Sequence, residues 1–85
     1  PKQVRLFYSV KMDENLEKAV GLAKLAANKA SDSHLKSEAF YVLGDVYQKL
    51  GRNEDACTAL KQSFELEPSS DTDERLKMLC VSEGN

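Results

Sequence analysis

The residues that could carry chemistry in this chain are few and lie far apart. His34 is the only histidine, and it falls in a predicted turn or first helical turn, where a surface role is expected. Cys57 and Cys80 have neither a second cysteine nor a histidine at the spacing of a zinc site, and each lies on the apolar face of a predicted helix. We therefore expect two buried free thiols, with a disulfide as the alternative.

A cluster of carboxylates lies in the run Asp71-Thr72-Asp73-Glu74. The run lacks the glycine and the ligand spacing of a calcium-binding loop. Negative side chains are favoured at the start of a helix, so a helix N-terminus is the better interpretation. Because the glycines are also dispersed and form no phosphate-binding loop, the sequence predicts a protein that is not an enzyme and has no cofactor and no metal site.

Length and composition limit the classes of protein that fit. The 85 residues make one small domain, and the abundance of Ala, Leu, Glu and Lys favours helix. The net charge of −2 gives no general attraction to nucleic acid, and no apolar run reaches the roughly 20 residues of a membrane span. We expect protein or peptide partners in a reducing cytoplasm, with no nucleic acid and no membrane insertion. The chain starts with Pro1 and shows no signal peptide, so we expect a piece of a longer protein.

Hydrophobic periodicity predicts an all-α fold of about five helices. The first covers about residues 3–11. Alternating apolar residues there also fit a strand, but a lone strand would have no partner. The later helices cover about 14–30 and 34–50, a segment between Asn53 and Pro68, and about 72–82.

Cap residues and glycines mark the helix ends. The expected N-caps are Asp13 or Asn15, Asn53, and Asp71 in a capping box with Glu74, and the run Ser31-Asp32-Ser33 is expected to form a capped turn. Gly51 is placed for a left-handed C-terminal cap. Gly44 lies mid-helix, where glycine costs about 1 kcal/mol relative to alanine, so another helix backbone must approach closely there.

The residues from Phe40 onward form a pattern that resembles the tetratricopeptide repeat. The positions that carry the resemblance are Phe40, Leu43, Gly44, Tyr47, Gly51, Ala56, Leu60, Ser63 and Pro68. Phe40 stands where the family usually has Trp, Leu60 where it has Phe or Tyr, and Ser63 where it has Ala. The resemblance implies antiparallel helix-turn-helix pairs that stack into a short right-handed superhelix.

A weaker copy of the pattern lies upstream, where Leu16, Ala19 and Ala26 parallel the second helix of the clear repeat. We expect a degenerate repeat at 3–30, a clear repeat at 34–70 and a capping helix at 71–83 within one domain 1–85. A plain antiparallel helical bundle is the alternative fold.

The resemblance also implies a function, because the first helix of each repeat lines the concave surface on which the family binds proteins. The residues expected there are Glu38, Tyr41, Asp45, Gln48 and Lys49. This predicts a non-catalytic interaction module that binds a protein or peptide segment. Some members grip the carboxylate of chaperone tails, but two acids on this surface would repel one, so we expect no such clamp.

Self-association is the alternative function, either as a homodimer or as stacking on another subunit. It is indicated by apolar residues beyond the main stripe of each helix: Leu22, Leu25, Met78 and Val81. Leu22 and Leu25 would place their helix between two neighbours.

Overall fold

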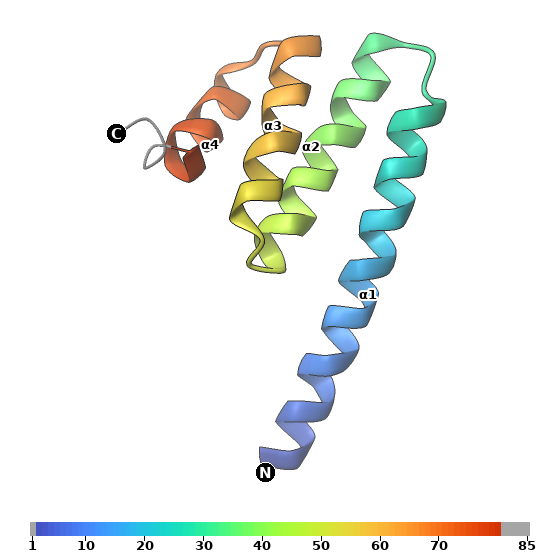
Figure 1. Cartoon of the computed structure of the whole chain (residues 1–85), viewed down its shortest axis with the longest axis vertical. Helices are drawn as coiled ribbons and strands as arrows, with labels where there is room; N and C mark the ends of the chain where they lie inside the picture. Colours follow the sequence, from blue (N-terminus) through green and yellow to red (C-terminus); the bar gives the residue numbers. More distant parts are fainter. Residues whose placement is uncertain (1, 81–85) are drawn as a thin grey trace.

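A computed structural model describes residues 2–80, with side chains from Lys11 onward. Over this range the chain forms four α-helices: α1 (Lys2–Lys29), α2 (Ser33–Lys49), α3 (Asn53–Leu66) and α4 (Ser70–Cys80). Consecutive helices run antiparallel, and α1, α2 and α3 lie side by side (Figure 1). The all-α fold of adjacent antiparallel pairs is confirmed. Val81 and the predicted end of the capping helix lie outside the described residues.

The number of helices differs from the prediction because α1 is continuous. Helices were expected at 3–11 and 14–30, with a cap at Asp13 or Asn15 between them. The junction contains no proline or glycine, and Lys11 Nζ lies 3.9 Å from Glu14 Oε1 across it, a spacing that supports a helix. The N-terminal half of α1 consequently extends beyond the end of α2 (Figure 1).

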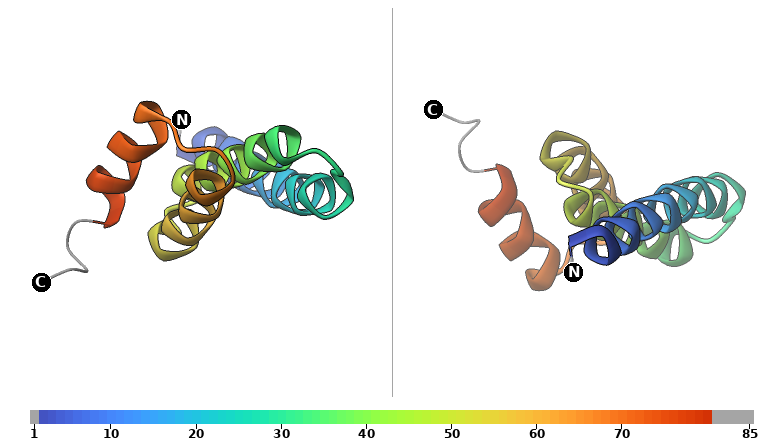
Figure 2. Two further views of the ribbon diagram at one scale, coloured as in Figure 1. Left: turned by 90° about the horizontal axis from the view of Figure 1, so that it is seen from above. Right: turned by 90° about the horizontal axis from the view of Figure 1, so that it is seen from below.

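The helices form a thin stack that measures 44 × 35 × 17 Å. α2 packs most extensively against α3 and next against α1, and α4 packs mainly against α3. Seen from above and below, α4 lies on the far side of the α2–α3 pair from α1 (Figure 2). α2 therefore occupies the centre of the stack, and α4 forms one end of it.

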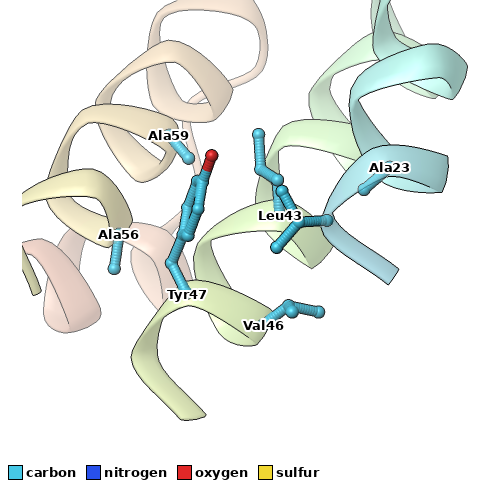
Figure 3. Packing of buried hydrophobic residues seen from close by; sticks show 7 residues of the cluster. Ala23, Leu43, Val46, Tyr47, Ala56 and Ala59 are labelled. Atoms are coloured by element: carbon cyan, nitrogen blue, oxygen red, sulfur yellow. The ribbon is translucent and has the colours of Figure 1, made fainter. Parts of the chain in front are cut away.

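The hydrophobic core lies on both sides of α2 (Figure 3). Tyr47 projects toward Ala56 and Ala59 of α3, and Leu43 lies on the side toward Ala23 of α1. These five residues are all less than a tenth exposed. The small side chains on α1 and α3 let their backbones approach α2 closely.

The two unusual glycines have the roles that the sequence predicted. A Cβ atom built on Gly44 would lie 2.8 Å from Leu60 Cγ and 3.3 Å from the Ala56 carbonyl oxygen, so α3 occupies the space that a side chain would need. Gly51 has φ of +79°, the left-handed conformation of a C-terminal cap.

The helix caps agree with the sequence at one site and differ at two. The Asp32 side chain accepts hydrogen bonds from the backbone amides of His34 and Leu35, as expected. Asn53 was wrongly expected to cap α3, since it is the first helical residue and Arg52 is the N-cap. The box of Asp71 with Glu74 was also wrong. α4 begins two residues earlier than expected, at Ser70, and the preceding Ser69 Oγ accepts from the Thr72 amide at 3.1 Å.

A disulfide joins Cys57 of α3 to Cys80 at the end of α4. The expectation of two free thiols was therefore wrong, and the alternative holds. The two residues are 23 positions apart in sequence, and only the turn after α3 brings them together. Because disulfides persist in oxidising environments, the bond weighs against the reducing cytoplasm that the sequence suggested.

Several large apolar side chains lie on the surface. Leu22 is 68% exposed and Leu25 is 50% exposed, so the second side of α1 faces no neighbour among the described residues. Leu35 and Val42 of α2 are also about half exposed. None of the helices in the described chain has the length and apolarity needed to cross a membrane.

Candidate functional site

The five residues predicted for the binding surface lie along α2 at helical spacing. Glu38, Gln48 and Lys49 are exposed, and Tyr41 and Asp45 are half-buried. The partial burial of the last two has a common cause, because the N-terminal and middle parts of α4 lie against them. The structure thus brings part of the predicted surface together with a helix that the sequence had assigned only to capping.

Arg75 of α4 is the residue that contacts this surface most closely. Its Nη1 donates to the Tyr41 hydroxyl at 3.2 Å, and its Nη2 donates to Asp45 Oδ1 at 3.2 Å and to Gln48 Oε1. The guanidinium carbon lies 5.2 Å from the centre of the Tyr41 ring, within the range of a cation–π contact. One arginine therefore engages three of the five predicted residues.

Further polar and charged contacts surround Arg75 on α2 and α4. The Tyr41 hydroxyl donates to Asp71 Oδ2 at 2.7 Å, and Lys49 Nζ lies 3.3 Å from Asp45 Oδ2. The hydrogen bond to Tyr41 and then the one to Asp45 raise the already high pKa of Arg75. The contact between α2 and α4 is consequently polar and charged, whereas the contact between α2 and α3 is mainly apolar.

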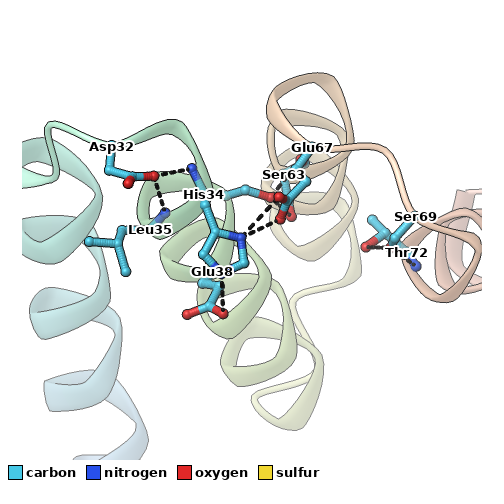
Figure 4. Close-up of polar contacts among 9 residues, drawn as sticks. Asp32, His34, Leu35, Glu38, Ser63, Glu67, Ser69 and Thr72 are labelled. Atoms are coloured by element: carbon cyan, nitrogen blue, oxygen red, sulfur yellow. Dashed lines mark hydrogen bonds and ion pairs between the residues drawn. The ribbon is translucent and has the colours of Figure 1, made fainter.

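Glu38 takes part in a second cluster, around His34 at the start of α2 (Figure 4). His34 Nδ1 lies 2.7 Å from Glu67 Oε1, and His34 Nε2 lies 3.1 Å from Glu38 Oε2. The bond to Glu67 is the main cause that raises the pKa of His34 above 6.5, with the charges of Glu67 and Glu38 next. The predicted surface role of His34 is confirmed, and its link to α3 was missed.

Beneath this cluster, Ser37 of α2 and Ser63 of α3 form a buried polar contact. The Ser37 hydroxyl donates to the Ser63 carbonyl oxygen at 2.9 Å, and the two hydroxyl oxygens lie 3.0 Å apart. A pocket of about 210 Å³ opens above them between α2, α3 and α4. Ser63, which replaces the family's alanine, therefore gains a hydrogen-bonding partner from the preceding helix.

Sequence reasoning missed Arg75 and Asp71 as neighbours of the predicted surface. The sequence does contain a signal for Arg75, since this residue follows Tyr41 by 34 positions, which is one repeat length. Equivalent positions in adjacent repeats lie on the same face of the stack. This spacing indicates that α4 stands where the first helix of a following repeat would stand.

A separate apolar groove of about 470 Å³ lies between the end of α1 and α2. Its walls include Ala26, Ala30, Leu35 and Val42, and Glu38 and Lys29 add charges. The groove lies on the side of α2 that faces away from α4.

The family comparison agrees with this geometry. Residues 37–70 match the family model described as Tetratricopeptide repeat, which is less than half of the chain. The matched segment contains most of α2, all of α3 and the turn that follows. No curated protein and no solved structure matches the chain.

The repeat implies a module for protein–protein interaction, in a family that is typically non-catalytic. In the described part of the chain, no three His, Cys, Asp or Glu side chains gather in a way that could hold a metal ion.

Proposed function

We propose that this chain binds a protein or peptide segment on the concave surface of α2, formed by the five residues predicted from the sequence. The observation that carries the proposal is the contact of Arg75 with Tyr41, Asp45 and Gln48. It demonstrates that these side chains converge well enough to hold one cationic group through several bonds at once. Binding by shape and charge requires no bond making.

The charges of the surface indicate the kind of ligand. Asp45 and Glu38 provide carboxylates, and Lys49 adds one positive charge at the end of α2. A basic or mixed-charge segment suits this arrangement better than an acidic one. The same two acids argue against a clamp for the terminal carboxylate of chaperone tails, because their negative charges would repel that carboxylate.

Selection from a library of displayed random peptides tests the proposal. The natural chain in excess dithiothreitol, with its disulfide reduced, should enrich sequences that contain Arg or Lys, and E38K/D45K should lose binding to the selected peptides. E54K/E65K is the matched control, because it makes the same change of net charge on exposed positions of α3. Unchanged binding by E38K/D45K, or selection of acidic C-terminal tails, would contradict the proposal.

Self-association is a second candidate function, favoured by the exposed apolar side chains. Leu22 is 68% and Met78 is 81% exposed, and the groove bounded by Leu35 and Val42 lies open beside α1. A second copy could cover these surfaces. Light scattering over a range of concentrations should then detect a dimer that L22K/M78K converts to a monomer, whereas a monomer at every concentration rules out this function.

A further inference from the structure

The contacts of Arg75 resemble those expected of a bound ligand more than those of a packed core. Its side chain is 22% exposed, and its guanidinium meets a carboxylate, an amide oxygen, a hydroxyl and an aromatic ring. A planar guanidinium has a fixed fork of donors, and a set of acceptors in this arrangement recognises it in preference to a lysine ammonium. The surface therefore has the chemistry of an arginine site, already occupied by the chain itself.

α4, which carries Arg75, is held weakly by apolar packing. Thr72 is the one residue of this helix that is buried, while Leu76 and Leu79 are half-buried and Met78 points to solvent. A helix of 11 residues is too short to be stable by itself in water. Arg75 at its middle and the disulfide at its end attach α4, together with the bond of Asp71 to Tyr41 and the packing of Leu79 against the core.

The disulfide prevents α4 from separating from the rest of the stack. Cys57 on α3 is 3% exposed, and Cys80 at the last turn of α4 is half-buried. The bond fixes the far end of α4, and the turn around Pro68 fixes the near end, so Arg75 is confined over the α2 surface from both sides. Confinement of this kind gives the internal arginine a high effective concentration against any competitor.

We propose that α4 is an internal ligand of the α2 surface that the Cys57–Cys80 disulfide holds in place, and that reduction opens this surface to an arginine side chain of a partner segment. The inference rests on the proposed function and adds to it the recognised side chain and its regulation. In the oxidised chain the arginine site is closed, and in the reduced chain it is in exchange with the partner.

The opening step requires a dithiol as reductant. One thiolate of the dithiol attacks the more accessible sulfur, that of Cys80, the disulfide bond breaks, and Cys57 leaves as a thiolate that takes up a proton. The second thiolate of the reductant then attacks its own mixed-disulfide sulfur, and Cys80 leaves and is protonated in turn. The dithiol becomes a disulfide, and two electrons pass to the protein.

The probe for this proposal is a labelled synthetic peptide with the α4 sequence, Ser70–Cys80, carrying serine in place of the cysteine. A matched peptide has glutamine in place of the arginine. Binding is measured to the oxidised chain, to the chain in excess dithiothreitol, and to C57S/C80S. The reduced and serine forms should bind the arginine peptide about tenfold or more tightly than the oxidised form does. These two forms should bind the glutamine peptide about tenfold more weakly than the arginine peptide.

A further pair of variants separates failure of this inference from failure of the proposed function. D45N in the C57S/C80S background should weaken binding of the arginine peptide, and E54Q in the same background, altered on α3, should not. Equal binding by the oxidised and reduced chains would overturn only the regulation by the disulfide, provided that D45N still weakens binding. Binding that D45N leaves unchanged overturns the surface itself, and absence of binding to every form overturns the inference.

Amide hydrogen exchange supplies a readout that does not depend on an added ligand. Reduction should speed exchange in α4 about tenfold or more while α2 and α3 keep their protection, because α4 opens without unfolding the repeat. Exchange in α4 that is the same before and after reduction would contradict the proposal.

Discussion

The two faces of α2 differ in how they hold their neighbours. Toward α3, α2 presents Gly44 and Tyr47, both buried, against alanines and Leu60. Toward α4, it presents Tyr41 and Asp45, both half-buried, against one arginine. The first interface is mainly apolar and closely packed, and the second is polar with few buried residues.

This difference indicates which part of the molecule defines the fold and which part can change. Removal of one well-buried apolar side chain is costly, because its neighbours close the resulting cavity only in part. A polar interface between half-exposed groups can exchange its bonds with water or with a ligand at a small net change of free energy. α2 and α3 therefore form the stable unit, and α4 forms the exchangeable one.

The largest expected effect compares a leucine from each interface. Leu60 is fully buried, so L60A should lower the free energy of unfolding by about 4 kcal/mol. Leu76 of α4 is half-buried, and L76A should lower it by about 1 kcal/mol. Urea denaturation of the oxidised variants measures both values. Equal losses would contradict the distinction between the two interfaces.

Removal of the disulfide should have the next largest effect. Its loop of 23 positions restricts the unfolded chain, so C57S/C80S should lower the free energy of unfolding by about 3 kcal/mol. Chemical denaturation of the variant measures this loss, and denaturation of the natural chain in dithiothreitol is the control that involves no substitution. An unchanged denaturation midpoint in both would show that the bond contributes nothing to stability.

Gly44 tests the closeness of α2 and α3. Alanine has the higher helix propensity, by about 1 kcal/mol, but its Cβ would meet Leu60 Cγ at 2.8 Å. We expect overpacking to prevail, with a net loss of about 1–2 kcal/mol in G44A by thermal or urea unfolding. G21A is the control, because nothing lies within 4 Å of a Cβ at that position. A G44A variant as stable as G21A would contradict the close packing.

The smallest effect concerns His34 and its bond to Glu67. The folded chain raises the pKa of His34 above 6.5, so this contribution to stability is fully present below pH 6.5 and is lost as pH rises through the folded pKa. The stability difference between the natural chain and H34Q should therefore be larger near pH 6 than near pH 8. Unfolding free energies at both pH values measure it, and a difference that does not change with pH contradicts the ion pair.

Local chemistry explains which parts of the fold were predictable. The 3.6-residue period identified α2 and α3, and Gly44 and Gly51 revealed a close approach and a left-handed cap from residue type alone. The start of α1 was predicted less well. Asp13 can cap a helix, which suggested a break there, but the segment contains no residue that forces the helix to end. A residue that can cap a helix begins one only where the preceding chain leaves the helical conformation.

Only the part of the candidate site that lies on α2 could be predicted from the sequence. The resemblance to the repeat family implied that Tyr41 and Asp45 lie on one face of α2, but their partners come from α4, which the sequence pattern describes poorly. The disulfide was missed for the same reason, since two cysteines 23 positions apart meet only through the turn at Pro68. Contacts between distant segments depend on turn geometry, which periodicity does not contain.

Mapping the bound arginine peptide on isotope-labelled C57S/C80S by NMR chemical-shift changes tests the binding surface most directly. The largest changes are expected at Tyr41, Asp45 and Gln48, where Arg75 lies in the oxidised chain. Changes concentrated instead at Leu35 and Val42, in the groove beside α1, would contradict the concave surface as the binding site.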